Sequence, residues 1–474
     1  MIAKTDTAGS ASRTEQYGLI GHPLGHSLSP VIHRALLKIL DIPGDYQLFD
    51  LNAGELQRKI PELMATLDGF NCTIPYKKQL VPYLSDLSPE ARRYGSVNTV
   101  YKGVGYNTDA AGFMATGFHY AGSRVLILGT GGVSHTMAHC VALAGAREVV
   151  FQTGHPTEAR AWLAELSSAY PAGSFHAYSP DQLAKAVQSN AEGFHFILNG
   201  TPAGMWPHAQ GLPLARDLYR DLLGRHELSG VFDAIYNPVA TRFILMAAAA
   251  GIRAVSGLHM LLFQAVEAQK IWHPERAADF DTAEVQARLT RLETELVSHL
   301  LEEYPVKLVL TGFMGSGKSS TGRLVADHLG KKVHYIDLDE AIVSRWCQSI
   351  SEMFATVGEA EFRRRERAML EEILARSGSI LLATGGGAMI QDGAEAIVRE
   401  KGGQIILLDV SLETALARSN GHNTRPLLNQ DYNAIVALYN QRRPLYLDMA
   451  DLVINADLGK AERVDLILRN LQLA

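Results

Sequence analysis

The residues with the clearest chemical potential form a glycine-rich loop that ends in a lysine and a serine, Gly312-Phe-Met-Gly-Ser-Gly-Lys318-Ser319. An apolar run precedes this loop and a helical pattern follows it, which is the setting of a P-loop. Backbone N–H groups of such a loop surround phosphate oxygens, the lysine reaches the outer phosphates and the hydroxyl holds Mg²⁺. The pattern therefore predicts an ATP site made by Gly312, Gly315, Gly317, Lys318, Ser319 and Ser320.

A second cluster of glycines follows another strand-like run, in Val125-Leu-Ile-Leu-Gly129-Thr-Gly131-Gly132. Glycines at the end of a strand let the backbone approach a pyrophosphate closely, as in dinucleotide-binding folds. A glycine-rich turn alone is a weak signal, so its meaning depends on the motifs around it.

Apolar runs alternate with helical patterns along the chain, which predicts α/β folds with parallel sheets. Between two series of expected strands, Asp281–Leu301 carries apolar residues at spacings of three and four and predicts a connecting helix. We expect this helix to begin with a capping box made by Asp281 and Glu284. The expected strands are Tyr17–Ile20, Val125–Leu128, Val149–Phe151, Phe194–Leu198 and Gly230–Ala234, then Val306–Thr311, His334–Ile336, Ile380–Ala383 and Gln404–Leu408.

Composition narrows the class of protein. A chain of 474 residues is too long for one core, so about three compact units are expected. The net charge of −6 gives no cationic excess for binding nucleic acid. Three distant cysteines offer no disulfide framework, Met1–Gln16 lacks the apolar core of a signal peptide, and the apolar stretch Phe243–Ile252 is too short to span a membrane. We expect a cytoplasmic enzyme of small molecules, with no nucleic-acid or membrane partner and a homodimer left open.

Five further motifs follow the P-loop in order. They are Tyr335-Ile-Asp337-Leu-Asp339, Glu361-Phe-Arg363-Arg-Arg-Glu366, Gly385-Gly386-Gly387, Asn423-Thr-Arg425-Pro-Leu-Leu and, as the last of the series, Arg442-Arg-Pro-Leu-Tyr446. With the P-loop, these motifs make Val306–Leu458 resemble the shikimate kinase family, which implies a P-loop domain that phosphorylates shikimate with ATP.

The resemblance implies a role for each motif, and the residue types suit those roles. Asp337 would hold Mg²⁺, and Asp339, expected on the same side of the strand end, would accept the proton of the attacking hydroxyl. Arg363 and Arg442 offer planar forks for a substrate carboxylate. The three glycines, Gly385, Gly386 and Gly387, would let a ring substrate lie against bare backbone.

Further arginines of this region fall into two groups. The resemblance makes Arg425 a lid residue that closes over ATP, with Arg418 as its companion. Arg364 and Arg365 are expected on a solvated helix face, and Glu366 is expected to hold Arg363 in place.

Seven motifs lie before or after the glycine turn at Gly129–Gly132. His26-Ser27-Leu-Ser29-Pro30, Asn71-Cys-Thr73-Ile-Pro75-Tyr-Lys77, Gly95-Ser-Val-Asn98-Thr99 and Gly105-Tyr-Asn-Thr-Asp109 precede it. Asn199-Gly-Thr-Pro-Ala-Gly204-Met205, Asp233-Ala-Ile-Tyr236-Asn237-Pro238 and Gly257-Leu-His-Met-Leu-Leu-Phe-Gln264 follow it. In this order they resemble the shikimate dehydrogenase family from Tyr17 to about Trp272, which implies a two-part unit with a Rossmann nucleotide domain.

This second resemblance implies reduction of a ring ketone. Hydride adds to the carbonyl carbon, so a cationic acid must meet the oxygen, and the pair Lys77 and Asp109 suits that task. Ser27 and Ser29 alternate along an expected extended loop and would bind the substrate carboxylate. The ring hydroxyls and the substrate edge would be held by Thr73, Asn98, Tyr236 and Gln264, and NADP by Gly129, Gly131, Gly132, Thr153, His155 and Gly257. His26 and His33 are interpreted as structural.

Two positions depart from the family pattern. Gln152-Thr153-Gly-His155-Pro lacks both the arginine that would clamp a 2′-phosphate and the carboxylate typical of NAD enzymes. His155 or Arg160 could replace that arginine, so NADP(H) is the expected cofactor. His259 stands where the family usually carries glycine, which could narrow the nicotinamide pocket.

The sequence therefore predicts a bifunctional enzyme of aromatic biosynthesis that uses NADP(H), ATP and Mg²⁺. Expected domains are 17–110 with 250–275 for substrate, 111–249 for NADP, a connector over 276–304, and a kinase over 305–474 of the nucleoside-monophosphate-kinase type. Two alternatives stay open: a kinase with a non-catalytic dehydrogenase-like domain, and a quinate-type dehydrogenase in the first half.

Overall fold

The computed structural model describes residues 13–25, 27–189, 192–419 and 432–473. These residues form two compact units. Unit 1 contains the chain up to His119, His135–Ala144 and His259–Glu293, and unit 2 contains Tyr120–Ser134, Gly145–Leu258 and the chain from Thr294 onward. The chain changes unit at five places. Three of these lie within helices, α5 (Gly132–Leu143), α10 (Gly257–Trp272) and α11 (Ala283–Glu303).

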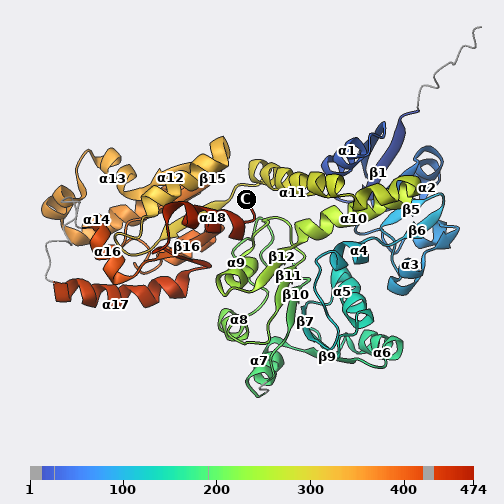
Figure 1. Ribbon diagram of the computed structural model, residues 1–474, viewed down its shortest axis with the longest axis horizontal. Helices are drawn as coiled ribbons and strands as arrows, with labels where there is room; N and C mark the ends of the chain where they lie inside the picture. Colours follow the sequence, from blue (N-terminus) through green and yellow to red (C-terminus); the bar gives the residue numbers. More distant parts are fainter. Residues whose placement is uncertain (1–12, 26, 190–191, 420–431, 474) are drawn as a thin grey trace, which may run out of the picture. The chain divides into compact units, whose positions relative to one another are not determined.

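Unit 1 is built on one mixed sheet with the strand order β2-β1-β3-β5-β6-β4 (Figure 1). β1 pairs in parallel with β2 and β3, and β5 pairs antiparallel with β3 and β6. The strands are β1 (Glu15–Gly21), β2 (Gly44–Asp50), β3 (Gly69–Cys72), β4 (Asp86–Leu87), β5 (Thr99–Tyr101) and β6 (Val104–Tyr106). The helices are α1 (Ser29–Ile39), α2 (Ala53–Thr66), α3 (Pro89–Tyr94) and α4 (Asp109–Met114), with 3-10 turns over Val81–Tyr83 and Pro274–Asp281.

Aromatic side chains fasten α10 to this sheet. The ring of Trp272 stacks on Tyr17 of β1 with centroids 4.6 Å apart, and its indole N–H donates to the Val100 carbonyl at 3.1 Å. Gly69 leaves room for the indole, because a Cβ there would lie 2.4 Å from Trp272 Nε1. His33 stacks on Tyr46 and is fully buried, which lowers its pKa to about 3 and agrees with a structural role.

The first sheet of unit 2 is parallel throughout, in the order β12-β11-β10-β7-β8-β9. The strand order reverses at β7, since β8 and β9 extend the sheet on one side of it and β10, β11 and β12 on the other. In such sheets ligands bind at the carboxyl ends of the strands at that point. The strands are β7 (Arg124–Leu128), β8 (Glu148–Gln152), β9 (Ser174–Tyr178), β10 (Phe196–Asn199), β11 (Gly230–Asp233) and β12 (Arg253–Ser256). The helices are α6 (Arg160–Ala169), α7 (Pro180–Ser189), α8 (Arg216–Leu223) and α9 (Arg242–Ala249).

The second sheet of unit 2 is also parallel, in the order β14-β15-β13-β16-β17. Its strands are β13 (Lys307–Thr311), β14 (Val333–Asp337), β15 (Ser379–Ala383), β16 (Gly403–Asp409) and β17 (Leu452–Asn455). Its helices are α12 (Lys318–Leu329), α13 (Leu338–Trp346), α14 (Ile350–Ala375), α15 (Ala394–Glu400), α16 (Leu412–Ser419), α17 (Tyr432–Met449) and α18 (Lys460–Asn470), with a 3-10 turn over Gly330–Lys332.

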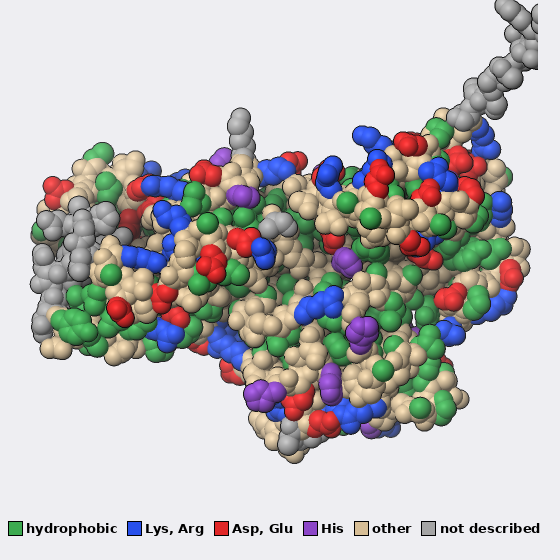
Figure 2. Space-filling model, in the orientation of Figure 1, with side chains coloured by type: hydrophobic (Ala, Val, Ile, Leu, Met, Phe, Trp, Pro, Cys, Tyr) green, Lys and Arg blue, Asp and Glu red, His purple; other side chains and the backbone are tan. Residues whose placement is uncertain are grey.

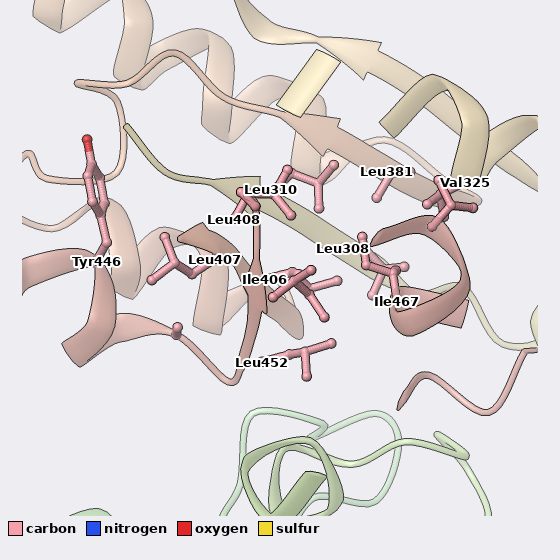
Figure 3. Packing of buried hydrophobic residues seen from close by; sticks show 14 of the residues in the cluster. Leu308, Leu310, Val325, Leu381, Ile406, Leu407, Leu408, Tyr446, Leu452 and Ile467 are labelled. Carbon is pink, nitrogen blue, oxygen red and sulfur yellow. The ribbon is translucent and has the colours of Figure 1, made fainter. Parts of the chain in front are cut away.

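Both faces of this second sheet are covered, so its central strands are buried and consist mainly of apolar residues. Figure 3 shows Leu308 and Leu310 of β13 packed with Ile406 and Leu408 of β16, and with Ile467 of α18. The opposite face packs against α13, α14 and α15, where Ile342, Met353, Leu370, Ile373 and Val398 are buried. On the face of the molecule that Figure 2 shows, Lys and Arg side chains are interspersed with Asp and Glu.

Every strand expected from the sequence is present, with ends within two residues of the expected ones. The connecting helix also forms, but the expected capping box was wrong: α11 begins at Ala283, and the Thr282 hydroxyl accepts the Val285 N–H at 3.4 Å. Asp281 instead ends a 3-10 turn and pairs with Lys270 at 3.3 Å. Among the described helices, none has the length and apolar character needed to cross a bilayer.

A buried carboxyl group joins the strand ends of the first sheet of unit 2. Asp233, which ends β11 and has no exposed surface, accepts hydrogen bonds from Asn199 Nδ2 of β10 at 2.9 Å and from the Ile235 N–H at 3.1 Å. Its other oxygen accepts from the hydroxyl of Thr241, the N-cap of α9, at 2.6 Å. Burial raises the pKa of Asp233 to about 7, although these hydrogen bonds act in the opposite direction.

Asp233→Asn should therefore reduce the pH dependence of stability. A folded-state pKa above the unfolded value means that the folded chain binds the extra proton, so this group stabilises at pH 4 and its contribution is lost as pH rises through about 7. Asparagine imitates the protonated group at every pH. The melting temperature of the variant should fall less between pH 5 and pH 8 than that of the parent chain. Equal falls in both, with exposed Asp465→Asn as the control, would contradict this assignment.

Candidate active sites

The glycine-rich loop of unit 2 connects β13 to α12. Gly317, the N-cap of α12, has a φ of 83°, a conformation that side chains other than glycine rarely adopt. Lys318 is buried, and its Nζ donates to the carbonyl oxygens of Gly312 at 2.8 Å and Phe313 at 3.0 Å. The loop thus places a cation and the N-terminus of a helix together, an arrangement that suits a polyphosphate.

Two side-chain oxygen groups that could bind a metal ion, those of Ser319 and Asp337, lie beside this loop. The Ser319 hydroxyl donates to Asp337 Oδ2 at 2.6 Å, and Ser320 donates to the Gly317 carbonyl at 3.1 Å. Asp337 ends β14 and also caps α13, since its Oδ1 accepts the Asp339 N–H at 3.0 Å. A hydroxyl and a carboxylate side by side form a donor set that fits Mg²⁺, which takes few protein ligands besides phosphates and water.

The sequence interpretation placed Asp339 at the end of the strand, but the structure places it elsewhere. Because Asp337 caps a helix, Asp339 falls in the first turn of α13. It still faces the glycines, since a Cβ added at Gly385 would lie 2.7 Å from Asp339 Oδ1 and 3.2 Å from Glu366 Oε1. The glycine backbone and these two carboxyl groups therefore form one wall.

Arg363 completes this wall from α14. Its Nη1 donates to buried Glu366 at 2.7 Å, and a Cβ added at Gly387 would lie 2.6 Å from the same nitrogen. Gln391 donates to Glu366 at 2.6 Å, and burial raises the pKa of Glu366. Glu366 thus holds Arg363 as expected, whereas Arg364 is exposed and pairs with Glu361. Arg365 is half-buried, pairs with Glu361 and stacks on Trp346.

α17 contributes from the other side of the glycines. The Arg442 Nη1 lies 3.5 Å from the Gly386 carbonyl, and its Nε is buried with no acceptor among the described residues. Tyr446, one turn later, donates its hydroxyl to the same carbonyl. Tyr446 was quoted within a motif but not predicted as a site residue. A guanidinium with an unused buried donor is suited to an anionic ligand.

Two other arginines bear on the phosphate end. Arg418 donates to the Ala456 carbonyl at 2.8 Å, at the end of β17. Buried Arg463 of α18 donates to the Ser316 carbonyl of the loop at 2.8 Å, a contact that no sequence motif predicted. The predicted lid residue Arg425 lies outside the described residues, as does His26.

In unit 1, the structure brings Lys77 and Asp109 together. Lys77 Nζ lies 2.5 Å from Asp109 Oδ2, and both side chains are mostly shielded from solvent. Asp109 is the first residue of α4, and its Oδ1 accepts from Asn98 Nδ2 at 2.9 Å. The lysine is thus held by a carboxylate that is itself held, as a general acid with fixed geometry requires.

Hydrogen bonds extend from this pair to residues of β2, β3 and β5. Asn98 also bonds Thr108, whose hydroxyl donates to Gln264 Oε1 at 3.3 Å. Asn71 donates to the Thr99 hydroxyl at 2.9 Å and accepts from the Tyr46 hydroxyl at 2.8 Å. The sequence predicted Asn98 and Gln264 but missed Thr108, which connects them, and also missed Tyr46, Asn71 and Thr99.

The two predicted carboxylate-binding serines do not lie on an extended loop. Leu28 is in the right-handed helical region and Ser29 is the first residue of α1, while Ser27 Oγ accepts the Ser29 N–H at 3.3 Å. The segment turns because Ser29-Pro30 starts a helix. Thr73 follows β3, and a Cβ at Gly21 would lie 2.4 Å from its methyl group.

The glycine turn that the sequence predicted to bind a dinucleotide lies in unit 2. Gly129 follows β7 with a φ of 89°, and a Cβ added at Gly131 or Gly132 would meet no atom within 4 Å. This bare backbone before α5 fits a pyrophosphate. At Gly257, by contrast, an added Cβ would lie 2.2 Å from the Ala234 carbonyl. Tyr236, on the loop after β11, is half-buried, and burial raises its pKa.

The loop after β8 carries the unusual cofactor residues. The Thr153 hydroxyl lies 3.4 Å from that of Thr130 and accepts the His155 N–H at 3.2 Å. The exposed His155 ring lies 3.4 Å from the Glu158 carboxylate. His259, the other departure, lies in unit 1 and pairs with Glu293 of α11 at 3.2 Å.

Two family models match this chain. The model of the shikimate dehydrogenase substrate-binding domain matches residues 19–100, and the shikimate kinase model matches residues 314–472. A shikimate dehydrogenase (NADP(+)) of Moorella thermoacetica is 36% identical over 264 residues, which cover 54% of this chain and 86% of that protein. One from Methanothermobacter thermautotrophicus is 36% identical and aligns over 55% of this chain and 91% of its own length.

One solved structure is also similar to this chain. The chorismate mutase/shikimate 5-dehydrogenase fusion protein from Clostridium acetobutylicum has a TM-score of 0.51 and 29% sequence identity. The superposition covers 61% of this chain and 99% of that one.

Gly387→Ala tests the wall between the glycines and Arg363. The added methyl group would push the guanidinium aside, because it would lie 2.6 Å from Nη1. The KM for the phosphate acceptor should rise by roughly tenfold, the effect of weakening one charged hydrogen bond, with little change in the KM for ATP. Gly459→Ala is the control, since a Cβ there meets nothing within 4 Å. An unchanged acceptor KM would remove Arg363 from the site.

Proposed function

Since the chain belongs to the shikimate dehydrogenase family through its N-terminal part and carries a C-terminal shikimate kinase domain, we propose that it catalyses two successive reactions. The first reduces 3-dehydroshikimate to shikimate with NADPH, and the second phosphorylates shikimate to shikimate 3-phosphate with ATP. The observation that carries the first half is the pair Lys77–Asp109, held by Asn98.

In the proposed reduction, NADPH supplies a hydride to the ketone carbon when it is bound. The Lys77 ammonium group meets the ketone oxygen and gives it a proton as negative charge develops there. Asp109 keeps Lys77 charged and oriented, and Asn98 fixes Asp109 in turn. Ser27 and Ser29 are proposed to hold the substrate carboxylate, Thr73, Asn98 and Gln264 the ring hydroxyls, and Tyr236 the substrate edge. Gly129, Gly131, Gly132, Thr153, His155 and Gly257 are proposed for the cofactor.

In the proposed phosphorylation, Mg²⁺ neutralises phosphate charge when it is bound, with Ser319 and Asp337 as its protein ligands. Lys318 and the loop N–H groups hold the phosphates, and Asp339 accepts the proton of the attacking hydroxyl. Arg363 and Arg442 hold the shikimate carboxylate, while the backbone of Gly385–Gly387 lies against the ring. Arg418 and Arg425 act at the nucleotide.

For the domain limits, the cellular location and the partners, we propose what the sequence predicted. The domain limits are 17–110 with 250–275, 111–249, 276–304 and 305–474. We propose a cytoplasmic enzyme whose ligands are small molecules, without a nucleic-acid or membrane partner, and leave a homodimer open. Assaying quinate beside shikimate separates the quinate-type alternative, and any NADPH-dependent turnover excludes a non-catalytic first half.

Reciprocal variants of the two lysines test the two-site proposal. Lys77→Ala should lower kcat for ketone reduction by ~10²–10⁴-fold, the usual effect of removing a positioned acid, and Asp109→Asn should act similarly. Lys318→Ala should abolish phosphoryl transfer. Each variant should leave the other activity intact, because Lys77 follows β3 and Lys318 follows β13, which are strands of different sheets. Near-normal reduction in Lys77→Ala, or loss of both activities in one well-folded variant, would refute the assignment.

Charge at the loop after β8 should set cofactor choice. We predict a preference for NADP(H), because His155 and Arg160 supply the basic side chains of this segment. Glu158→Gln should increase the preference, since its carboxylate lies 3.4 Å from His155 and would repel a 2′-phosphate. His155→Ala and Arg160→Ala should each reduce it, by roughly 10-fold or more for a lost charged contact. The measurement is kcat/KM with both cofactors. A strong preference for NAD(H), or an NADP(H) preference that none of the three changes moves, would contradict this interpretation.

A further inference from the structure

Within unit 2, the nucleotide domain of the dehydrogenase contacts the end of a kinase helix. α17 carries Arg442 and Tyr446 beside the Gly386 carbonyl and ends at Met449. The last backbone carbonyl groups of α17 accept hydrogen bonds from arginines of α8 and α15. Figure 1 shows α8 and α9 next to this end of α17.

Two arginines of α8 bind this helix end directly. Arg220 Nη1 donates to Asp448 Oδ1 at 2.6 Å, and its Nη2 donates to the Leu447 carbonyl at 3.3 Å and to the Asp448 carbonyl. Arg216, one turn earlier on the same face of α8, also donates to the Asp448 carbonyl. The Arg220 guanidinium holds the pKa of Asp448 below its ordinary value. Cations at a helix C-terminus satisfy free carbonyl groups and oppose the negative end of the helix dipole.

The turn after α17 is fixed from the same side. Asp451 is buried, and its carboxylate accepts from Arg242 Nε of α9 at 2.8 Å, from the Ile405 N–H at 2.8 Å and from Arg399 of α15. Arg399 also donates to the Met449 carbonyl at 2.7 Å. Apolar Leu245 of α9 packs in the same hydrophobic cluster as Leu452 of β17. Residues of both domains thus determine where α17 ends.

Two features of α17 make the position of its C-terminal end depend on residues outside the helix. Pro444 lies inside it and cannot donate the hydrogen bond that would join it to the preceding turn. Arg442 lies six residues before Asp448, roughly 9 Å along a helix axis, so a shift of the end reaches the acceptor site. The hydroxyl contact of Tyr446 with Gly386 falls between the two.

We propose that Arg216 and Arg220 are positioning residues of the kinase: the dehydrogenase's nucleotide domain holds the C-terminal end of α17 and thereby fixes Arg442 and Tyr446 at the acceptor site. The proposal rests on the proposed role of Arg442 in binding shikimate. It makes the nucleotide domain a structural part of the kinase, beyond its own cofactor site.

The test uses the full chain with Arg216→Ala, Arg220→Ala and the double variant. The KM for shikimate should rise by roughly 5–20-fold in the double variant, with a change below twofold in the KM for ATP and in dehydrogenase kcat/KM. Arg220→Lys should restore part of the affinity, because it keeps the charge. Arg225→Ala is the matched control, since Arg225 is also an arginine of this segment but pairs with Asp221 and the Val187 carbonyl.

A shikimate KM that stays within twofold in the double variant would overturn the proposal, as would equal rises in the KM values for shikimate and ATP. If the double variant does not fold, Arg220→Gln replaces it, with the same two criteria applied at a threshold of twofold. The Arg442→Ala variant distinguishes failure of the proposed acceptor site from failure of the proposed role of Arg216 and Arg220. No rise in shikimate KM there would overturn the proposed acceptor site, whereas a rise confined to Arg442→Ala would overturn only the role of Arg216 and Arg220.

Discussion

In a parallel sheet all strands end at the same edge, and the placement of the functional residues depends on this constraint. β14, β15 and β13 are neighbours, so the loops that follow them bring Asp337, Gly385 and Gly312 together although they are far apart in the sequence. The same rule places Gly129, Asn199 and Asp233 at one edge of the first sheet of unit 2. In unit 1 it brings Thr73, after β3, beside Gly21 at the end of β1.

Once these side chains are gathered at one edge, hydrogen bonds to buried partners fix their orientation. Asn98 holds Asp109, which holds Lys77, and Glu366 holds Arg363 in the same way. Charged groups need such partners because an unpaired charge is costly in a partly dry site. Each candidate site therefore consists of a reactive group and a residue that only orients it. The contacts of α8 with α17 extend this pattern from single side chains to a whole helix.

The sequence predicted what is local and missed what is long-range. The P-loop and the glycine turn after β7 are short motifs that follow expected strands, and Lys77 and Asp109 each belong to a short motif. Contacts such as Tyr46–Asn71 and Arg463–Ser316 join residues 25 and 147 positions apart, which no local pattern encodes. Two geometric assumptions were wrong because polar residues started helices: Asp337 caps α13, which moves Asp339 off the strand, and Ser29 begins α1.

The central claim is that one chain carries two successive reactions on one carbon skeleton. The most direct measurement supplies the intact chain with 3-dehydroshikimate, NADPH, ATP and Mg²⁺, and follows products by mass spectrometry and NADPH by absorbance. The account predicts transient shikimate, then shikimate 3-phosphate, with one NADPH oxidised for each molecule of 3-dehydroshikimate consumed. Phosphorylation of added shikimate without any NADPH-dependent reduction, or reduction that stops at shikimate in the presence of ATP, would contradict it.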